Sequence, residues 1–99
     1  MKINVNSIKF KTDSKLETLI REKIEKLSTH YDSIISSDIT LKLENTNAVD
    51  NKVVEVRLAI RGNDLYSKKQ SKTFEEALDS ATDALKKQLT KHKEKVKRI

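Results

Sequence analysis

The spacing of apolar residues changes twice along this chain, and this change constrains the fold more than any other feature. Between residues 16 and 31 apolar side chains recur every three or four positions, the repeat of an amphipathic helix. Within 36–44 and 52–61 they alternate with polar ones, as in strands that bury one face. From residue 74 the helical repeat returns and continues nearly to the end. We therefore expect helices and strands in separate segments.

The N-terminal segment predicts a strand followed by a helix. Within residues 2–10 the apolar residues first alternate and then change parity at Asn6-Ser7, so we expect the strand to end or bulge there. The helix has two candidate N-caps. Ser14 precedes Glu17 by three positions, which is capping-box spacing, and Asp13 is an equally good cap.

The C-terminal half predicts a hairpin and a second helix. In Arg61-Gly62-Asn63-Asp64 the Gly-Asn pair favours a tight turn, because both residues tolerate positive φ. A fourth strand runs from Leu65 to about Gln70. Thr73 and Glu76 have capping-box spacing and open the last helix. The apolar stripe of this helix consists of Phe74, Leu78, Ala81, Leu85, Leu89, His92 and Val96.

The predicted order of elements is strand, helix, strand, strand, strand, helix. The first crossover makes two strands parallel, and the later strands form an antiparallel meander. The outer face of the strands carries polar residues such as Asn4, Lys42, Glu55 and Arg57, so both helices must cover the other face. We expect a single α+β domain over residues 1–99 with a four-stranded sheet, broadly like a double-stranded RNA-binding domain, whose last few residues fray.

Composition excludes several classes of function. The 99 residues include no cysteine and one glycine, so disulfides, thiolate nucleophiles, thiol-rich zinc sites and glycine-rich phosphate loops are not available. We expect no cofactor, no metal and no small-molecule substrate. The sequence lacks both a membrane-spanning apolar run and the apolar region of a signal peptide, so we expect a cytoplasmic protein without membrane contact.

The net charge of +6 comes from the C-terminal end. Residues 1–83 contain fourteen basic and fourteen acidic residues, whereas residues 84–99 contain seven basic residues and only Glu94. The seven are Lys86, Lys87, Lys91, Lys93, Lys95, Lys97 and Arg98. The helix macrodipole accounts for two or three cations at a C-terminus, but ladders of like charge four residues apart are destabilising. A polyanion such as a phosphate backbone would relieve this repulsion.

No catalytic constellation is expected. His92 lies on the apolar stripe of the last helix, which favours a structural role, and His30 suits the C-terminal end of the first helix for dipole reasons. Acidic and basic residues are equal in number on the first helix, so that face is expected to pair with itself. Aromatic residues are few, and recognition of nucleic acid is expected to rely on phosphates and shape.

Short runs in both helices and one strand match a known family. They are Phe74, Ala77-Leu78-Asp79, Leu85, Gln88-Leu89, Lys91-His92-Lys93 and Lys95 in the last helix, with Leu16, Lys23, Lys26-Leu27, Tyr31-Asp32 and Leu41-Lys42-Leu43-Glu44 earlier. Through these residues the chain resembles the short ribosome hibernation promoting factors. These are also called ribosomal subunit interface proteins and belong to the sigma-54 modulation protein family.

The resemblance implies a non-enzymatic translation inhibitor that stabilises inactive ribosomes in stationary phase or under stress. Such proteins bind the small ribosomal subunit in the channel that messenger and transfer RNA would occupy, and we expect this chain to be monomeric off the ribosome. The expected contacts to ribosomal RNA are Lys86, Lys87, Lys91, Lys93 and Lys95, together with Lys23 and Lys26. The last two rest on the resemblance alone.

The chain also departs from the family pattern. Lys68-Lys69-Gln70-Ser71-Lys72 is more basic than the small and acidic residues that relatives often carry there, and the sequence stops at Ile99, as in the short form.

The sequence is also compatible with two other functions. One is a general double-stranded nucleic-acid-binding protein, and the other is a protein-interaction module whose basic helix docks an acidic partner.

Overall fold

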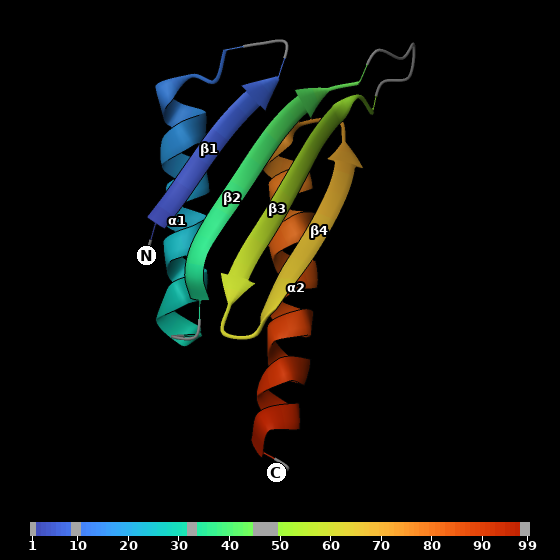
Figure 1. The fold of residues 1–99 in the computed structure, drawn as a ribbon. Coiled ribbons are helices and arrows are strands. Elements are labelled where there is room, and N and C mark those ends of the chain that lie inside the picture. Colours follow the sequence, from blue (N-terminus) through green and yellow to red (C-terminus); the bar gives the residue numbers. More distant parts are fainter. Residues whose placement is uncertain (1, 9–10, 32–33, 45–49, 98–99) are drawn as a thin grey trace.

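Six elements follow one another in the order that the apolar spacing predicts. The computed structural model describes residues 2–8, 11–31, 34–44 and 50–97, with the backbone alone for residue 30 and for 93–97. The elements are β1 (Lys2–Ile8), α1 (Ser14–His30), β2 (Ile34–Leu43), β3 (Lys52–Ile60), β4 (Asn63–Ser71) and α2 (Phe74–Lys97). The expected α+β class is confirmed (Figure 1).

The four strands form one mixed sheet in the order β1-β2-β3-β4. β1 and β2 are parallel, and the two later pairs are antiparallel. Both helices lie on the same face of the sheet, with α1 behind β1 and β2 and α2 behind β3 and β4 (Figure 1). This arrangement was expected because each strand has only one apolar face to bury.

The core lies between this face and the two helices. Alternate positions of β2 and β3 turn inward and are fully or almost fully buried. They pack with the apolar stripes of the helices, and the cluster comprises Ile20, Ile24, Leu27, Ile34, Ile39, Leu41, Val54, Val56, Leu58, Ile60, Leu65, Ala77, Leu78, Ala81, Leu85 and Leu89. Each large aliphatic side chain buried in this way stabilises the fold by roughly 1.5–3 kcal/mol.

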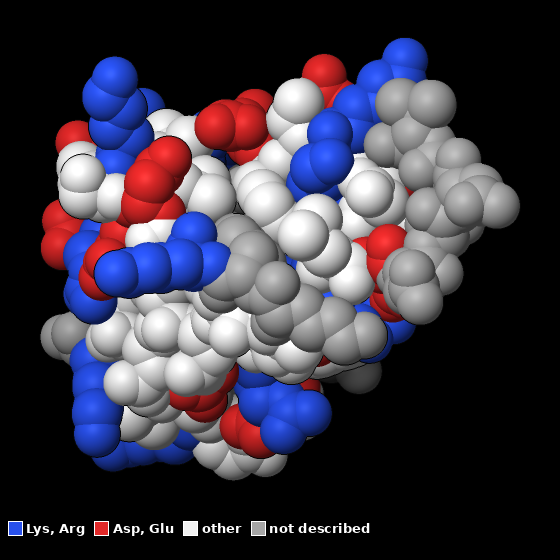
Figure 2. Space-filling model, turned by 90° about the horizontal axis from the view of Figure 1, so that it is seen from above, with Lys and Arg blue, Asp and Glu red and all other residues white. Residues whose placement is uncertain are grey.

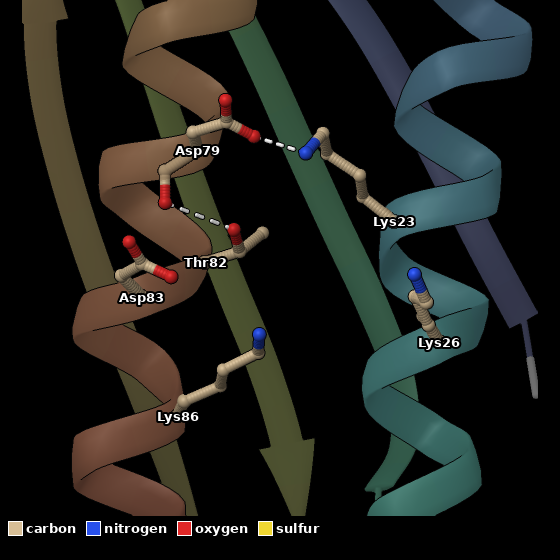
Figure 3. Close-up of a pocket in the computed structure, with 6 residues that line it drawn as sticks. All are labelled: Lys23, Lys26, Asp79, Thr82, Asp83 and Lys86. Carbon is tan, nitrogen blue, oxygen red and sulfur yellow. Dashed lines mark hydrogen bonds and ion pairs between the residues drawn. The ribbon is translucent and has the colours of Figure 1, made fainter.

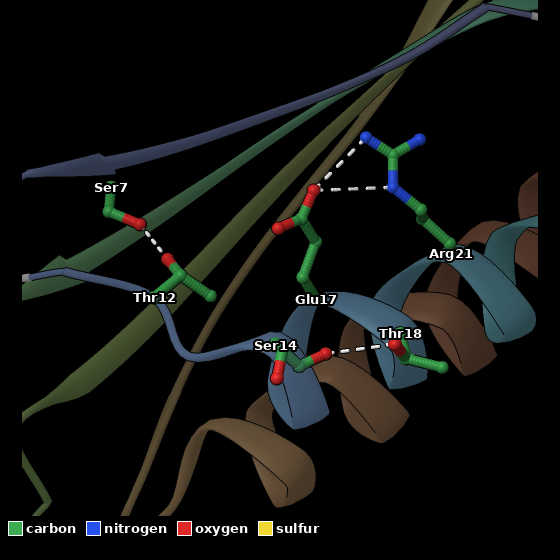
Figure 4. Close-up of polar contacts among 6 residues, drawn as sticks. All are labelled: Ser7, Thr12, Ser14, Glu17, Thr18 and Arg21. Carbon is green, nitrogen blue, oxygen red and sulfur yellow. Dashed lines mark hydrogen bonds and ion pairs between the residues drawn. The ribbon is translucent and has the colours of Figure 1, made fainter.

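The predicted bulge in the first strand is wrong. β1 pairs with β2 in unbroken register from Lys2 to Ile8, and its side chains alternate between exposed and half-buried over the whole strand. Ser7 therefore takes an inward position, and its hydroxyl contacts that of Thr12 (Figure 4). Ile8 points outward and is 43% exposed. The change of parity reflects a polar residue at an inward site, and Phe10 lies outside the described residues.

The hairpin between β3 and β4 is confirmed, but its turn is one residue earlier than expected. Ile60 pairs with Asn63, so Arg61 and Gly62 form the two-residue connection. Gly62 has a φ of +82°, a conformation that costs a residue with a side chain far more than glycine. Asn63 already belongs to β4, because it takes part in the strand pairing.

Asp13, and not Ser14, caps α1. The Asp13 carboxylate accepts a hydrogen bond of 2.8 Å from the backbone N–H of Leu16. Glu17, the acidic residue of the alternative capping box, instead accepts from the Arg21 guanidinium at 3.2 Å (Figure 4). Arg21 is four residues away on the exposed face of the helix, so this pair contributes little to stability.

Only half of the predicted capping box forms at the start of α2. The Thr73 hydroxyl accepts from the backbone N–H of Glu76 at 3.1 Å, as expected. The Glu76 carboxylate does not complete the box, because it accepts a hydrogen bond of 2.8 Å from the Ser71 hydroxyl. The end of β4 is thereby joined to the first turn of α2.

Replacing the Asp13 cap should destabilise the protein measurably. We expect Asp13→Ala to lower the free energy of unfolding by about 1 kcal/mol, because the Leu16 N–H loses its acceptor. The measurement is the midpoint of urea unfolding. Ser14→Ala is the matched control and should change the free energy by less than about 0.5 kcal/mol. A larger loss in Ser14→Ala than in Asp13→Ala would contradict the assignment of the cap.

Candidate nucleic-acid interface

The α2 lysines selected from the sequence do not all lie on the same side of the helix. An α-helix turns by about 100° per residue, so Lys86 and Lys87 cannot point the same way, whereas Lys87 and Lys91 share a side. Lys86 points toward α1, where it lines a cleft between the helices. Lys87 and Lys91 are exposed on the other flank. Lys93 and Lys95 belong to α2, but their side chains lie outside the described residues.

The cleft between α1 and α2 brings Lys23, Lys26 and Lys86 together. It has a volume of about 300 Å³, and α2 contributes Asp79, Thr82 and Asp83 to its lining. Figure 3 shows the Lys23 and Lys86 side chains extending into the space between the helices, with Lys26 lying over α1. The structure thus places the two α1 lysines, which were chosen by resemblance alone, beside one of the α2 lysines.

Two aspartates offset much of the positive charge in the cleft. Lys23 forms an ion pair with Asp79 across the helices (Figure 3). Asp83 also lines the cleft, and no ion pair between it and Lys87, four residues later, is found among the described residues. The cleft therefore carries three lysines and two carboxylates. Of its three amines, that of Lys23 is paired, and those of Lys26 and Lys86 have no ion pair among the described residues.

A second contact between the helices lies near the end of α1. The Tyr31 hydroxyl is 3.0 Å from that of Thr90, one turn beyond Lys86 on α2. Together with the Lys23–Asp79 pair, this contact ties α1 to α2 at two levels. These two links set how the helix backbones that carry Lys26 and Lys86 lie relative to each other.

The end of the molecule at which both helices begin carries charges of both signs. In Figure 2, which looks onto this end, Lys and Arg side chains are interleaved with Asp and Glu over the described part of the surface. Acidic residues in the first turns, Glu17 on α1 with Glu75 and Glu76 on α2, contribute to this mixture and suit the positive ends of the helix dipoles. This end offers no uniform positive surface to a polyanion.

The structure describes the side chain of one of the two histidines, His92. His92 is half-buried on α2, as the structural reading predicts, while the side chain of His30 lies outside the described residues. Among the residues that the structure describes, no three His, Cys, Asp or Glu side chains are grouped closely enough to hold a metal ion. In the same residues, no helix combines the length and apolar character needed to cross a membrane.

The uncovered face of the sheet holds a polar hollow that sequence reasoning missed. It has a volume of about 220 Å³ and is lined by Asp38, Thr40, Glu55, Arg57 and Tyr66. Tyr66 is 46% exposed, and the Arg57 guanidinium lies 5.8 Å from the centre of its ring. Its outward position follows from the strand period, since Leu65 and Ser67 on either side of it are buried.

The environment of this hollow raises the pKa of Tyr66. Partial burial raises the pKa of Tyr66 above its ordinary value of 10.0, and the hydrogen bond that its hydroxyl donates to Glu55, 3.0 Å long, adds to the increase. The negative charge of Glu55 acts in the same direction, while Arg57 opposes it. The protonated phenol is thus favoured in the folded protein.

The titration of Tyr66 should respond to Glu55. We expect Glu55→Gln to lower the Tyr66 pKa toward 10.0, because the carboxylate that opposes ionisation is removed. The tyrosinate absorbance measures this, and Tyr66→Phe identifies the transition. The contribution of Tyr66 to stability is present below pH 10.0 and is lost as the pH rises through the higher folded-state pKa. An unchanged titration in Glu55→Gln would contradict the proposed cause.

Comparison with known proteins agrees with the fold. The model of the family described as Sigma 54 modulation protein / S30EA ribosomal protein matches residues 3–97. The ribosome hibernation promoting factor of Pseudomonas putida is 27% identical over 95 residues, which cover 96% of this chain and 89% of that protein. The ribosome hibernation promotion factor of Bacillus subtilis is 30% identical over 98 residues, which cover 99% of this chain and 51% of the longer relative.

A solved structure has the same fold. The ribosomal subunit interface protein from Coxiella burnetii superposes with a TM-score of 0.84 and 19% sequence identity, over 94% of this chain and 98% of that one. At this identity the likeness concerns the fold, including the mixed sheet with both helices on one face. The family match extends over both helices and all four strands. The chain therefore belongs to the Sigma 54 modulation protein / S30EA ribosomal protein family.

Proposed function

We propose that this protein is a ribosome hibernation factor. It binds the small ribosomal subunit through phosphates of the ribosomal RNA, occupies the channel used by messenger and transfer RNA, and keeps the ribosome inactive. The observation that carries the proposal is the set of lysines on α2 without an ion pair among the described residues, Lys86, Lys87 and Lys91, in a chain of this family. Relatives named ribosome hibernation promoting factors support it.

Charge distribution supports binding to phosphates over binding to bases. Ammonium groups attract the phosphate backbone whatever its sequence, and the release of condensed counterions makes such binding strongly salt-dependent. The lysines of α2 lie away from the exposed ring of Tyr66, which is on the opposite face of the sheet, and the Tyr31 hydroxyl beside α2 is taken up by its contact with Thr90. Specificity for the ribosome then comes from the shape of the channel and the spacing of the phosphates.

Occupation of the channel accounts for inhibition without any catalytic step. A folded protein that fills the site competes directly with messenger and transfer RNA, so no nucleophile, general base or cofactor is required. The role is non-enzymatic, and the protein acts in the cytoplasm, where ribosomes are found. We expect Lys93 and Lys95 to extend the lysine surface of α2, as their positions near its end suggest.

Ribosome binding should depend on the lysines of α2. We expect wild-type protein to cosediment with purified small subunits, and Lys87→Glu/Lys91→Glu/Lys95→Glu to bind at least about 100-fold more weakly if each lost contact contributes about 1 kcal/mol. Circular dichroism checks that the variant folds. The control Lys2→Glu/Lys11→Glu/Lys15→Glu makes the same change in net charge at exposed sites on β1 and before and within the first turn of α1.

Two results would contradict this proposal. The first is wild-type protein that stays at the top of a low-salt gradient while small subunits sediment. The second is equal loss of binding in both triple variants, which would indicate a response to net charge alone. Comparable affinity for small subunits and for a random RNA duplex would favour a general double-stranded nucleic-acid-binding protein, because phosphate contacts by themselves carry little specificity.

The salt dependence of binding gives an independent measurement. If a few phosphates are neutralised, the slope of log affinity against log salt should lie between about −2 and −5. The α2 triple variant should show a shallower slope than wild type, since it contacts fewer phosphates. A slope near zero in the wild-type protein would mean that the lysines do not contact RNA.

A further inference from the structure

Two hydrogen bonds fix α2 alongside β4. Near the start of the helix, the Ser71 hydroxyl donates to the Glu76 carboxylate at 2.8 Å. Three turns later, the Gln88 side-chain amide donates to the backbone carbonyl of Tyr66 at 3.0 Å. The strand and the helix run in opposite directions, so the two bonds join them at two separate levels. We call the surface between these bonds, from Tyr66 to Ser71 on β4 and from Glu76 to Gln88 on α2, the strip.

Lysines from both elements border this strip. Lys69 lies between Tyr66 and Ser71, and it shares its side of the sheet with the buried Leu65 and Ser67, so it faces the helix layer; it is nevertheless exposed. Lys72 follows directly after β4 and is also exposed.

The helical repeat determines which lysines of α2 lie beside this strip. Lys87 is turned by about 100° from Gln88, so it lies between the cleft and β4, and Lys91, one turn later, is rotated about 40° closer to the β4 side. We name the set Lys69, Lys72, Lys87 and Lys91 the edge surface. On α2 its members are separated by a rise of about 6 Å, and on the strand side by about 10 Å.

The edge surface is less compensated than the cleft. Among the described residues none of its four amines forms an ion pair, whereas the cleft holds the Lys23–Asp79 pair and a second carboxylate. Next to β4, Ser80 and Ala84 of α2 carry no charge, but Asp83, which also lines the cleft, lies one turn before Lys87 without forming an ion pair with it. Glu76, at one end of the strip, accepts the Ser71 hydroxyl.

We propose that the edge surface binds a strand of RNA phosphates separately from the cleft, so that the protein contacts two phosphate strands at once. The inference deepens the proposed function, on which it rests, and it adds Lys69 and Lys72 to the residues that contact ribosomal RNA. The two surfaces are distinct because Lys87 and Lys91 are turned by about 100° and 140° from Lys86 around the axis of α2.

The same geometry argues against a strand of another protein as the occupant. A strand that joined the open edge of β4 would need its free backbone groups. One of these, the Tyr66 carbonyl, already accepts the Gln88 amide. Lysines on an edge strand also repel a second copy of the same strand. Phosphates need only the ammonium groups, which remain accessible.

The test compares three double variants by their binding to purified small subunits and to a short RNA duplex. Lys69→Gln/Lys72→Gln should bind both about 10-fold more weakly than wild type and show a salt slope shallower by about 1 to 2. Lys11→Gln/Lys15→Gln, with the same change in charge on the far side of the molecule, should match wild type. All four lysines are exposed, and circular dichroism confirms folding.

Additivity tests whether the surfaces are separate. Lys26→Gln/Lys86→Gln removes the two cleft amines that have no described ion pair. Combined with Lys69→Gln/Lys72→Gln, its loss of log affinity should add to that of the edge variant, as for independent sites. A combined loss no greater than the larger single loss would overturn the two-strand arrangement.

The outcomes separate this inference from the proposed function. If wild type binds small subunits and Lys69→Gln/Lys72→Gln equals its control on both ligands, the edge surface is disproved and the hibernation role is untouched. If wild type fails to bind small subunits while the edge variant weakens duplex binding, the proposed function fails and the phosphate surface is supported. Equal affinities of all variants for both ligands would overturn the inference.

Discussion

The burial of a single sheet face is the constraint on which the rest of this structure depends. β2 and β3 present their apolar side chains on one side only, so both helices must pack there next to each other. Their contact creates the cleft that contains Lys23, Lys26 and Lys86, and it leaves the opposite face of the sheet open with its polar hollow. The positions of all candidate binding residues follow from this division into two layers.

Charge compensation divides the surface in a way that net charge alone does not reveal. The beginning of each helix carries acidic residues, the cleft balances three lysines with two aspartates, and the edge of β4 presents lysines without described acidic partners. The excess of positive charge in the sequence is therefore spread over several surfaces, which differ in how many of their lysines are offset by acidic residues. Next to β4, the four lysines of the edge surface have no ion pair among the described residues.

The order of elements, the mixed sheet and the inward-facing core residues could be predicted because they follow from the repeat of apolar residues. The unbroken course of β1 could not, since an inward Ser7 looks like a break in the pattern when its partner Thr12 is unknown. The choice of Asp13 as cap needed the geometry of the Leu16 N–H, because both candidates satisfy the sequence rule. The helical period predicts that Lys86 and Lys87 point in different directions. Which surface each lysine belongs to could not be predicted, because that depends on α1 lying on one flank of α2 and β4 on the other. Lys69 and Lys72 adjoin the helix only in three dimensions, and their role as RNA contacts is a proposal.

The length of α2 has a thermodynamic consequence. Figure 1 shows that the helix continues past the sheet toward the C-terminus. In that part the helix lacks the packing against strands that stabilises its first turns, and its lysines repel one another along the axis. A bound anion that removes this repulsion strengthens the helical state, and by linkage a more stable helical end favours the anion equally. The helical content of the projecting turns and the affinity for the partner are therefore two measures of the same equilibrium.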